Sequence, residues 1–447
     1  MRAYPLTIVL SLLAATAPMA QELTLDAAVE AALVNNPEIL AAQERALAAG
    51  SRADQARGHR WFQLDLSEAF SYTNNPAEVF AMELNQGRFD MEKFFLSDPN
   101  NPDPLTTWIT SLEVTQPIYT GGMLAARIGQ AESMATAEEY TSAHARQHVV
   151  FETITAYVNL AKAREHEALL KKSRATTAEH VRLAEQYAAQ GMILEADVLQ
   201  ARVYLSEVDD LLTQASNGAL LAQAALNFQM GADQLLPRTT APLPPPPPVV
   251  GSLEDWIDAA LQGRNDLGAA RLQMEAGRLE EKAARSRYLP EIGAVGRYDL
   301  YDDKIFGANG HSGSVMAFAK INLWRGGSDA AALAAARHNT ASFEADIHRF
   351  EEGVRLEVQQ AWIDLVMAGS LHSTASSALA AAGESLRVRE RRFKQGLDKM
   401  LDLLDAETAL REAEMRELVA RYDVTLDTKR VYFLSGKTLI ASTEESR

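Results

Sequence analysis

The spacing of hydrophobic positions changes twice along this chain, and each change predicts a passage from helix to strand and back. From Phe62 to Tyr72 apolar side chains alternate with polar ones, and a second alternating run covers residues 108–114. Two further runs of this kind cover residues 292–300 and 315–323. Alternation with a period of two is typical of strands with one apolar face. We therefore expect two β-hairpins, over residues 62–116 and 291–323.

Each predicted hairpin is followed by a long stretch with helical periodicity. No proline occurs from Ile118 to Leu236 or after Pro290, so the commonest helix breaker is missing. Between Leu194 and Leu226 apolar residues recur at alternating steps of four and three, the heptad spacing of coiled coils. A further helical stretch, interrupted near Pro37, precedes the first hairpin. The pattern predicts a mainly α protein with some β, built on long antiparallel helices.

The chain contains an internal repeat of this pattern. Gly191, Asp197 and Leu205 recur as Gly396, Asp402 and Leu410, always 205 positions later. The same shift carries the glycine pair Gly121–Gly122 onto Gly326–Gly327. A constant register over half a chain indicates a duplicated structural unit. We expect a first repeat over residues 21–240 and a second over 252–447, each with a helical corner, at 191–205 and 396–410.

Two segments fall outside the repeat. Residues 241–251 contain five consecutive prolines, which predict a stiff polyproline strap between the repeats. Leu25 matches Leu253 at a larger offset than the later positions, so the first repeat carries 23 additional residues between about Trp61 and Gln116. These residues are rich in Asn, Asp and Pro, and we expect them to fall in the connection between the two strands of the first hairpin. In a membrane barrel such a long loop lies outside, where it would narrow the outer mouth, serve as a receptor for phage or have no function.

Composition narrows the class of protein. The 447 residues carry a formal charge of −17, which argues against a nucleic-acid partner. No cysteine is present, so disulfides are excluded. Residues 1–20 combine Arg2, an apolar run and small residues before Ala20, as in a secretory signal peptide. No other stretch is apolar enough to cross a bilayer as a helix, so any crossing is expected from strands.

Four strands cannot close a sheet on themselves. In lipid, an open sheet edge leaves unsatisfied backbone groups that cost several kcal/mol each. If the strands lie in a membrane, the barrel must therefore be shared between chains. A small soluble sheet at the end of a coiled coil is the alternative interpretation of the same pattern.

Several motifs together resemble the outer-membrane efflux protein family, the TolC-like channels of Gram-negative bacteria. They are the opening LTLDAAVEAALVNNPEI, the strand-to-helix turns QPIYTGG and NLWRGG, Tyr288–Pro290, and the two corners. The resemblance implies a homotrimer that places a twelve-stranded β-barrel in the outer membrane, four strands from each protomer, and a long α-helical barrel in the periplasm. It also implies a periplasmic membrane-fusion adaptor and an inner-membrane transporter of RND or ABC type as partners.

The resemblance assigns roles to the second corner. Asp402 and Asp405 match two family aspartates that form acidic rings at the periplasmic entrance. Carboxylates from three chains would repel one another and favour cations. The alternative for Asp402 is an ordinary helix cap. Asp197, its partner in the first corner, is expected to be a cap or a contact of the gate.

The sequence also departs from the family at this corner. In the family, an aromatic hydroxyl and a basic residue hold the gate closed, whereas the matching positions here are Phe393 and Asp398. The family's latch therefore cannot be transferred to this chain. We expect other contacts of the corner to replace it, with Arg391, Arg392 or Lys399 pairing with Asp197 or Glu195.

No arrangement of residues supports an enzyme. A nucleophile with a base, a phosphate loop and a dinucleotide fingerprint are all missing from places where the predicted elements would support them. His144 and His148 have the i, i+4 spacing of metal ligands, but no third ligand is nearby. We expect neither cofactor nor metal. The two functions to weigh are an exit duct for efflux or type I secretion and a periplasmic coiled-coil scaffold without a pore.

Overall fold

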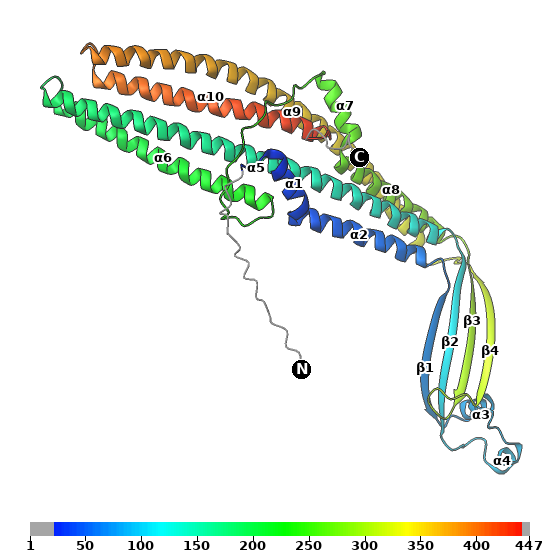
Figure 1. Ribbon diagram of the computed structural model, residues 1–447. Coiled ribbons are helices and arrows are strands. Elements are labelled where there is room, and N and C mark those ends of the chain that lie inside the picture. Colours follow the sequence, from blue (N-terminus) through cyan, green and yellow to red (C-terminus); the bar gives the residue numbers. More distant parts are fainter. Residues whose placement is uncertain (1–21, 440–447) are drawn as a thin grey trace, which may run out of the picture. The chain divides into compact units, whose positions relative to one another are not determined.

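The structure, a computed structural model, describes residues 22–439. The predicted signal peptide and the residues after 439 lie outside the described part. The described chain forms two compact units, one made of residues up to 40, 145–264 and from 354 onward, the other of residues 41–144 and 265–353. Each unit combines segments of both sequence repeats. The two longest helices, α5 (Met123–Ala189) and α9 (Ser328–Lys394), each contribute to both units (Figure 1).

The long helices occur in pairs of equal length. The pairs are α1 (Leu25–Asn35) with α7 (Leu253–Gly263), α2 (Pro37–Gly58) with α8 (Asn265–Ser286), α5 with α9, and α6 (Glu195–Gln229) with α10 (Met400–Leu434). The members of the first two pairs start 228 positions apart and those of the last two 205 apart. The helices thus repeat at the two offsets that the sequence shows.

Glycines mark equivalent close approaches in the two repeats. Gly231 follows α6 with φ of 64°, and a Cβ there would lie 2.4 Å from the carbonyl oxygen of Asn35 at the end of α1. Gly436 follows α10 with φ of 70°, and its Cβ would lie 2.7 Å from the carbonyl oxygen of Gly263 at the end of α7. Only glycine combines this backbone conformation with such contact.

The heptad face of α6 is buried as its spacing predicts. The exposed fraction is 5% or less for Val198, Ala201, Val208 and Leu226. Leu194, by contrast, is 72% exposed because it is the N-cap of the helix rather than part of its packed face. Small residues in such a seam allow helices to approach closely.

The second unit contains one antiparallel sheet in the order β1-β2-β3-β4. Its strands are β1 (Gln63–Thr73), β2 (Leu105–Thr120), β3 (Glu291–Asp302) and β4 (Gly310–Lys320). The register places Leu66 opposite Leu112, which lies opposite Tyr298, so apolar side chains of three strands share one face. The other face carries Asp65, Glu113, Arg297 and Asp299. A single sheet thus has one apolar and one polar face.

The hairpin limits differ in detail from the sequence pattern. Strand β2 continues past Gln116 to Thr120, with a register shift between Pro117 and Tyr119. Strand β4 ends at Lys320 rather than at residue 323. The Asn322 side chain beyond it donates instead to Asp329 in the first turn of α9, at 2.6 Å.

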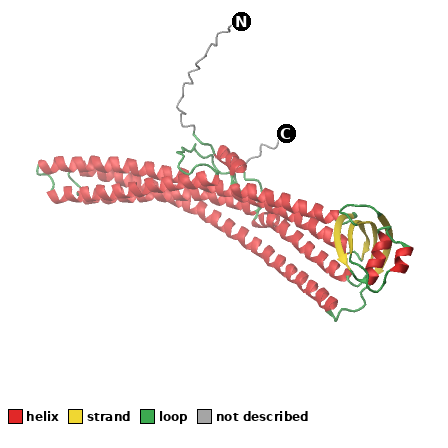
Figure 2. Cartoon of the chain, turned by 90° about the horizontal axis from the view of Figure 1, so that it is seen from below, coloured by secondary structure: helices red, strands yellow, loops and turns green. Residues whose placement is uncertain are grey.

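The additional residues of the first repeat lie in the connection between β1 and β2. They form two short helices, α3 (Pro76–Asn85) and α4 (Met91–Leu96). The side chains of Asn75 and Asp90 accept hydrogen bonds from the first backbone N–H groups of these helices, which is the usual role of such residues at an N-cap. Figure 2 shows both helices beside the sheet.

The proline-containing linker has no regular secondary structure and crosses α5 and α10. Its start is paired with the beginning of the first repeat, because the Leu23 N–H donates to the Thr239 carbonyl at 2.8 Å and Leu23 O accepts from Ala241 N–H at 2.9 Å. The hydroxyl of Tyr157 lies 2.7 Å from Leu23 O and 3.0 Å from Ala241 O. Burial raises the pKa of Tyr157 to about 12, so the phenol stays protonated as a donor to these carbonyls.

Candidate functional site at the helical corners

The first corner is a tight turn between α5 and α6. Gly191 adopts φ of 73°, and the N–H of Met192 donates to the Tyr187 carbonyl at 2.9 Å. This closes the end of α5 in the manner of a glycine C-cap. Asp197 lies in the first turn of α6 and accepts from the backbone N–H of Leu194 at 3.1 Å. Asp197 therefore caps the start of α6, which is one of the two roles expected for it.

The second corner repeats this backbone between α9 and α10. Gly396 also has φ of 73°, and the N–H of Leu397 donates to the Arg392 carbonyl at 2.9 Å. Asp402 accepts from the N–H of Lys399 at 3.2 Å. Asp402 is therefore a helix cap within the chain, while Asp405, one turn further, is exposed. The backbone of the two corners is the same in kind.

The second corner carries an ion cluster that the first lacks. Asp398 lies 2.8 Å from Nε of Arg392 and 3.2 Å from Nη1 of Arg389, and its side chain is only 4% exposed. The hydrogen bond from Arg392, followed by that from Arg389, lowers the pKa of Asp398. Within this chain Arg392 thus pairs inside its own corner and not with Asp197 or Glu195. The acidic residue at 398 closes the turn over the end of α9.

Phe393 belongs to the core beneath this cluster. It is 3% exposed, and its ring centroid lies 5.9 Å from that of Tyr187 on α5. The same core contains buried apolar residues of α6 and α10, namely Val198, Ala201, Val208, Met400, Leu403 and Leu404. Phe393 therefore joins the two corners through apolar packing.

Two polar contacts between the repeats were not expected from the sequence. In the first, the Arg411 guanidinium donates to the hydroxyl of Tyr204 at 2.8 Å and lies 5.3 Å from the centre of its ring. The Thr408 hydroxyl lies 3.1 Å from the same oxygen. Tyr204 is on α6 and its partners are on α10. This contact holds the returning helices of the two corners side by side.

The second contact is a buried histidine–glutamate pair. Nδ1 of His180 on α5 lies 2.6 Å from Oε1 of Glu407 on α10, although the geometry is that of an ion pair and not of an aligned hydrogen bond. Thr177 donates to the other carboxylate oxygen at 3.3 Å. The side chains are 10% and 6% exposed. Burial lowers the His180 pKa, but contact with Glu407 and its charge outweigh burial, and the pKa is raised.

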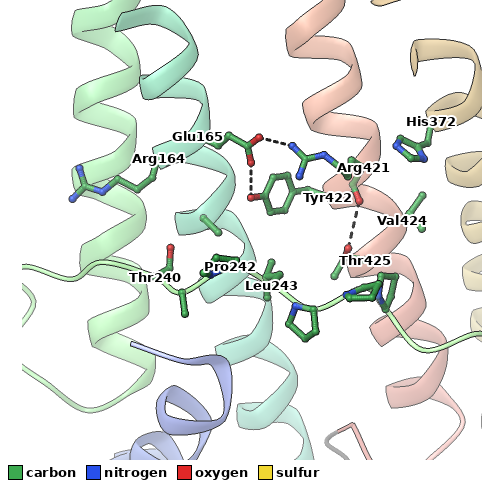
Figure 3. A pocket seen from close by; sticks show the side chains of 15 residues that line it. Arg164, Glu165, Thr240, Pro242, Leu243, His372, Arg421, Tyr422, Val424 and Thr425 are labelled. Atoms are coloured by element: carbon green, nitrogen blue, oxygen red, sulfur yellow. Dashed lines mark hydrogen bonds and ion pairs between the residues drawn. The ribbon is translucent and has the colours of Figure 1, made fainter. Parts of the chain in front are cut away.

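Further from the corners, a groove of about 670 Å³ lies beneath the proline linker. Figure 3 shows Glu165, Arg421 and Tyr422 meeting on its wall. Glu165 lies 2.5 Å from the Arg421 guanidinium and accepts from the Tyr422 hydroxyl at 2.9 Å. Burial and then Glu165 raise the pKa of Tyr422 to about 12. These contacts join α5 to α10 where the linker crosses them.

The four predicted strand-to-helix glycines all have positive φ. Gly121 and Gly122 have φ of 64° and 86°, and Gly326 and Gly327 have 60° and 83°. A Cβ on Gly121 would lie 2.6 Å from the Ser286 carbonyl oxygen. Both glycine pairs stand between a strand and a long helix, where consecutive left-handed residues favour glycine.

The histidine spacing noted in the sequence does not lead to a metal site in the described part of the chain. His148 lies 3.7 Å from Glu38 and 4.0 Å from Glu152. Among residues 22–439 no group of three or more His, Cys, Asp or Glu side chains could hold a metal ion. None of the helices in that range is long and apolar enough to cross a membrane.

Comparison with known protein families gives a match over most of the chain. The model of the outer membrane efflux protein family matches residues 28–232 and 256–437. Each segment contains one of the two corners. The first segment ends before the proline linker and the second begins after it.

Individual proteins agree with the family match. The outer membrane efflux protein BepC of Brucella suis biovar 1 is 23% identical over 340 residues, which cover 75% of this chain and 73% of BepC. The alkaline protease secretion protein AprF of Pseudomonas aeruginosa is 23% identical over 353 residues, covering 74% of this chain and 70% of AprF. The Campylobacter jejuni CmeC outer membrane channel superposes with a TM-score of 0.79 at 16% identity, covering 94% and 88% of the two chains. The last similarity shows a shared fold.

Proposed function

The chain belongs to the outer membrane efflux protein family, and we propose that it forms the homotrimeric exit duct of a tripartite efflux pump or a type I secretion system. Its place in this family makes it an outer-membrane channel protein and not an enzyme. The observation that carries the proposal is the two-faced sheet joined to long paired helices. Cargo passes through such a duct chemically unaltered.

The sheet supports a trimer because its two edges are open in one chain. Strands β1 and β4 each pair on one side only. In lipid, unsatisfied backbone groups along such edges cost several kcal/mol each. Three chains together would pair every edge in a twelve-stranded barrel. Its apolar face, with Leu66, Leu112 and Val315, would then contact outer-membrane lipid, and its polar face would line the lumen.

The partners follow from the family. Outer membrane efflux proteins function with an adaptor and an inner-membrane transporter. We propose that the corners of this chain are the end at which a periplasmic membrane-fusion adaptor and an RND or ABC transporter dock. BepC is named for efflux and AprF for secretion of an alkaline protease, so the relatives support both kinds of cargo.

The acidic residues of the second corner would line the entrance. Asp405 is exposed, and Asp402 keeps one carboxylate oxygen on the Lys399 N–H. In a trimer these positions contribute six carboxylates around one axis, which favours cations over anions. The cap and the ring do not exclude each other, because the cap of Asp402 uses a single oxygen.

Single-channel conductance in a planar bilayer tests the proposal. The detergent-purified protein should give small cation-selective steps, and Asp405→Ala should reduce the selectivity. Asp402→Ala with Asp405→Ala should abolish it. Asp197→Ala is the matched control, since it removes the equivalent cap from the first corner but no carboxylate of the proposed ring. A protein that stays soluble without detergent and gives no conductance would contradict the duct and favour a coiled-coil scaffold.

A further inference from the structure

The α3–α4 segment, residues 74–104, is folded against the sheet at the strand ends away from the long helices. The segment connects β1 to β2, whereas α2 precedes β1 and α5 follows β2. Figure 1 shows α3 and α4 at those strand ends. Val79 and Gln86 of the segment are buried, with exposures of 5% and 1%, whereas Phe80 is 41% exposed. The segment is thus a small packed structure with its own buried residues.

Its anchors lie on one face of the sheet. Nε2 of Gln86 donates to the Thr107 hydroxyl at 2.8 Å, and the Thr73 hydroxyl donates to Glu78 at 2.8 Å. A Cβ on Gly310 would lie 1.7 Å from the carbonyl oxygen of Asn85, so α3 contacts β4 directly through this glycine. Thr107 is completely buried. Strands β1, β2 and β4 therefore all contact this segment.

The register shows which face that is. Thr73 lies an even number of residues from Asp65 on β1, as does Thr107 from Glu113 on β2. Gly310 lies opposite Tyr301, which is two residues from Asp299 on β3. Side chains two residues apart on a strand point to the same side. Helix α3 consequently lies on the polar face, which is the lumen face of the proposed channel.

The segment also ties the two hairpins together. Arg88 lies 3.2 Å from Asp303 in the loop between β3 and β4, and it donates to the Gln86 side chain at 3.3 Å. Both ends of this bridge are beyond the regular strands. The segment is therefore fixed to both hairpins of the chain and cannot swing away without breaking these contacts.

The tip of the segment is an exposed apolar cluster, in which the Phe95 ring contacts that of Phe94 at 5.9 Å. Phe80, Phe89 and Phe94 form a cluster with ring centroids 5.4 to 5.5 Å apart. Phe95 and Leu96 project from it and are 78% and 82% exposed. Burial of such side chains against another apolar surface is favourable. An exposed apolar cluster of this kind marks a place where another apolar surface binds.

We propose that the α3–α4 segment is a constriction of the outer mouth, in which Phe95 and Leu96 of each protomer pack against the same residues of the neighbouring protomers. The proposal rests on the homotrimeric duct proposed above. In a threefold arrangement each chain carries one such tip on the lumen face, so the second copy is the occupant that the position of the segment supports.

Cysteine cross-linking tests the contact, because the chain has no cysteine of its own. Under mild oxidation, Phe95→Cys in the detergent-purified protein should yield covalent dimers on a non-reducing gel. Leu235→Cys is the matched control, since Leu235 is 86% exposed but lies in the turn after α6. Absence of dimers from Phe95→Cys, in a preparation that forms channels, would overturn the proposed contact.

Labelling of intact cells tests the constriction. Ser67 is exposed on the polar face of β1, so Ser67→Cys reports access from outside. A small maleimide should label it, and a polymer-linked maleimide should label it only after residues 76–103 are replaced by a short Gly-Ser linker. Equal labelling by the large reagent with and without the segment would overturn the constriction. Failure of the small reagent as well would contradict the lumen itself.

A second variant guards against misfolding of the shortened chain. Phe95→Ser with Leu96→Ser leaves Phe80, Phe89 and Phe94 in place and should increase labelling by the large reagent. Phe95→Leu with Leu96→Met keeps the tip apolar and should label as slowly as the natural tip. Identical labelling of the two double variants would show that an apolar tip does not close the mouth.

Discussion

The two corners of this protein have the same backbone and different chemistry. Gly191 and Gly396 share φ of 73°, and Asp197 and Asp402 accept from the equivalent N–H groups at 3.1 and 3.2 Å. The second corner alone has the Asp398 ion cluster. The position equivalent to Asp398 in the first corner is Ile193, which packs against the apolar core.

The comparison separates the residues that the turn requires from the charges that differ between the two copies. Glycine and an aspartate cap are local requirements of any such corner, and both copies keep them. Charge is free to vary, and in this chain it is concentrated in one copy. The two copies also differ at position 407, where Glu407 is buried beside His180 of the other repeat. Its counterpart Arg202 forms an exposed pair with Glu185 of its own repeat.

The largest effect is expected from Phe393, the apolar link between the corners. Phe393→Ala should destabilise the protein by about 3 kcal/mol or more, since a buried ring leaves a cavity. The melting temperature of the detergent-solubilised protein, followed by circular dichroism, measures this. Phe393→Leu retains most of the packing and should lose much less. Equal losses for the two variants would mean that Phe393 is not part of a packed core.

The next effect concerns the ion cluster. Asp398→Asn should leave the Arg389 and Arg392 guanidinium groups side by side without their shared carboxylate, and their repulsion should loosen the second corner. We expect a larger unitary conductance. The equivalent change in the first corner, Ile193→Ala, removes no charge and should leave the conductance near that of the wild type. If both variants conduct alike, the asymmetry of the corners has no part in closing the pore.

The histidine–glutamate pair should make stability depend on pH. Because the His180 pKa is raised in the folded state, its contribution is complete below the unfolded value of about 6.5 and is lost as pH rises through the folded value. The melting temperature should therefore decrease over that window, and Glu407→Gln should flatten the decrease. His372→Gln, which removes a histidine paired with Glu417 on the surface, is the control. A slope that survives Glu407→Gln would exclude this pair as its source.

The smallest effect should be the same at both corners. Asp197→Ala and Asp402→Ala each remove one cap, and each should cost about 1 kcal/mol. Their melting temperatures should therefore fall by similar amounts. A much greater loss for Asp402→Ala would show that its role in stability extends beyond the cap.

The features that the sequence predicted are those whose causes are local. Alternation gave the strands, heptads gave the buried face of α6, and the Gly396 to Asp402 spacing gave the turn and its cap. The pairing of Arg392 with Asp398 is also local, six residues across the turn, whereas the expected partners Asp197 and Glu195 belong to the other corner.

The features that the sequence did not predict have two different causes. His180 and Glu407 lie on helices of different repeats, and only packing of these helices brings them together, so no spacing along the chain announces them. The helices α3 and α4, by contrast, do leave signals. Asn75 before Pro76 and Asp90 before Met91 are ordinary helix starts, which the abundance of Asn, Asp and Pro around them obscured.

The contact of Tyr157 with Leu23 and Ala241 has a consequence for how the chain is made. The hydroxyl of Tyr157 binds the chain at the beginning of the first repeat and just after its end. The second repeat begins independently at Ser252, where the side chains of Ser252 and Asp255 cap α7. Peptide continuity between the prolines is therefore not needed to hold either end in place. Two separately translated half-length polypeptides, divided within the proline run and each given a signal peptide, should assemble into the same protein as the single gene product.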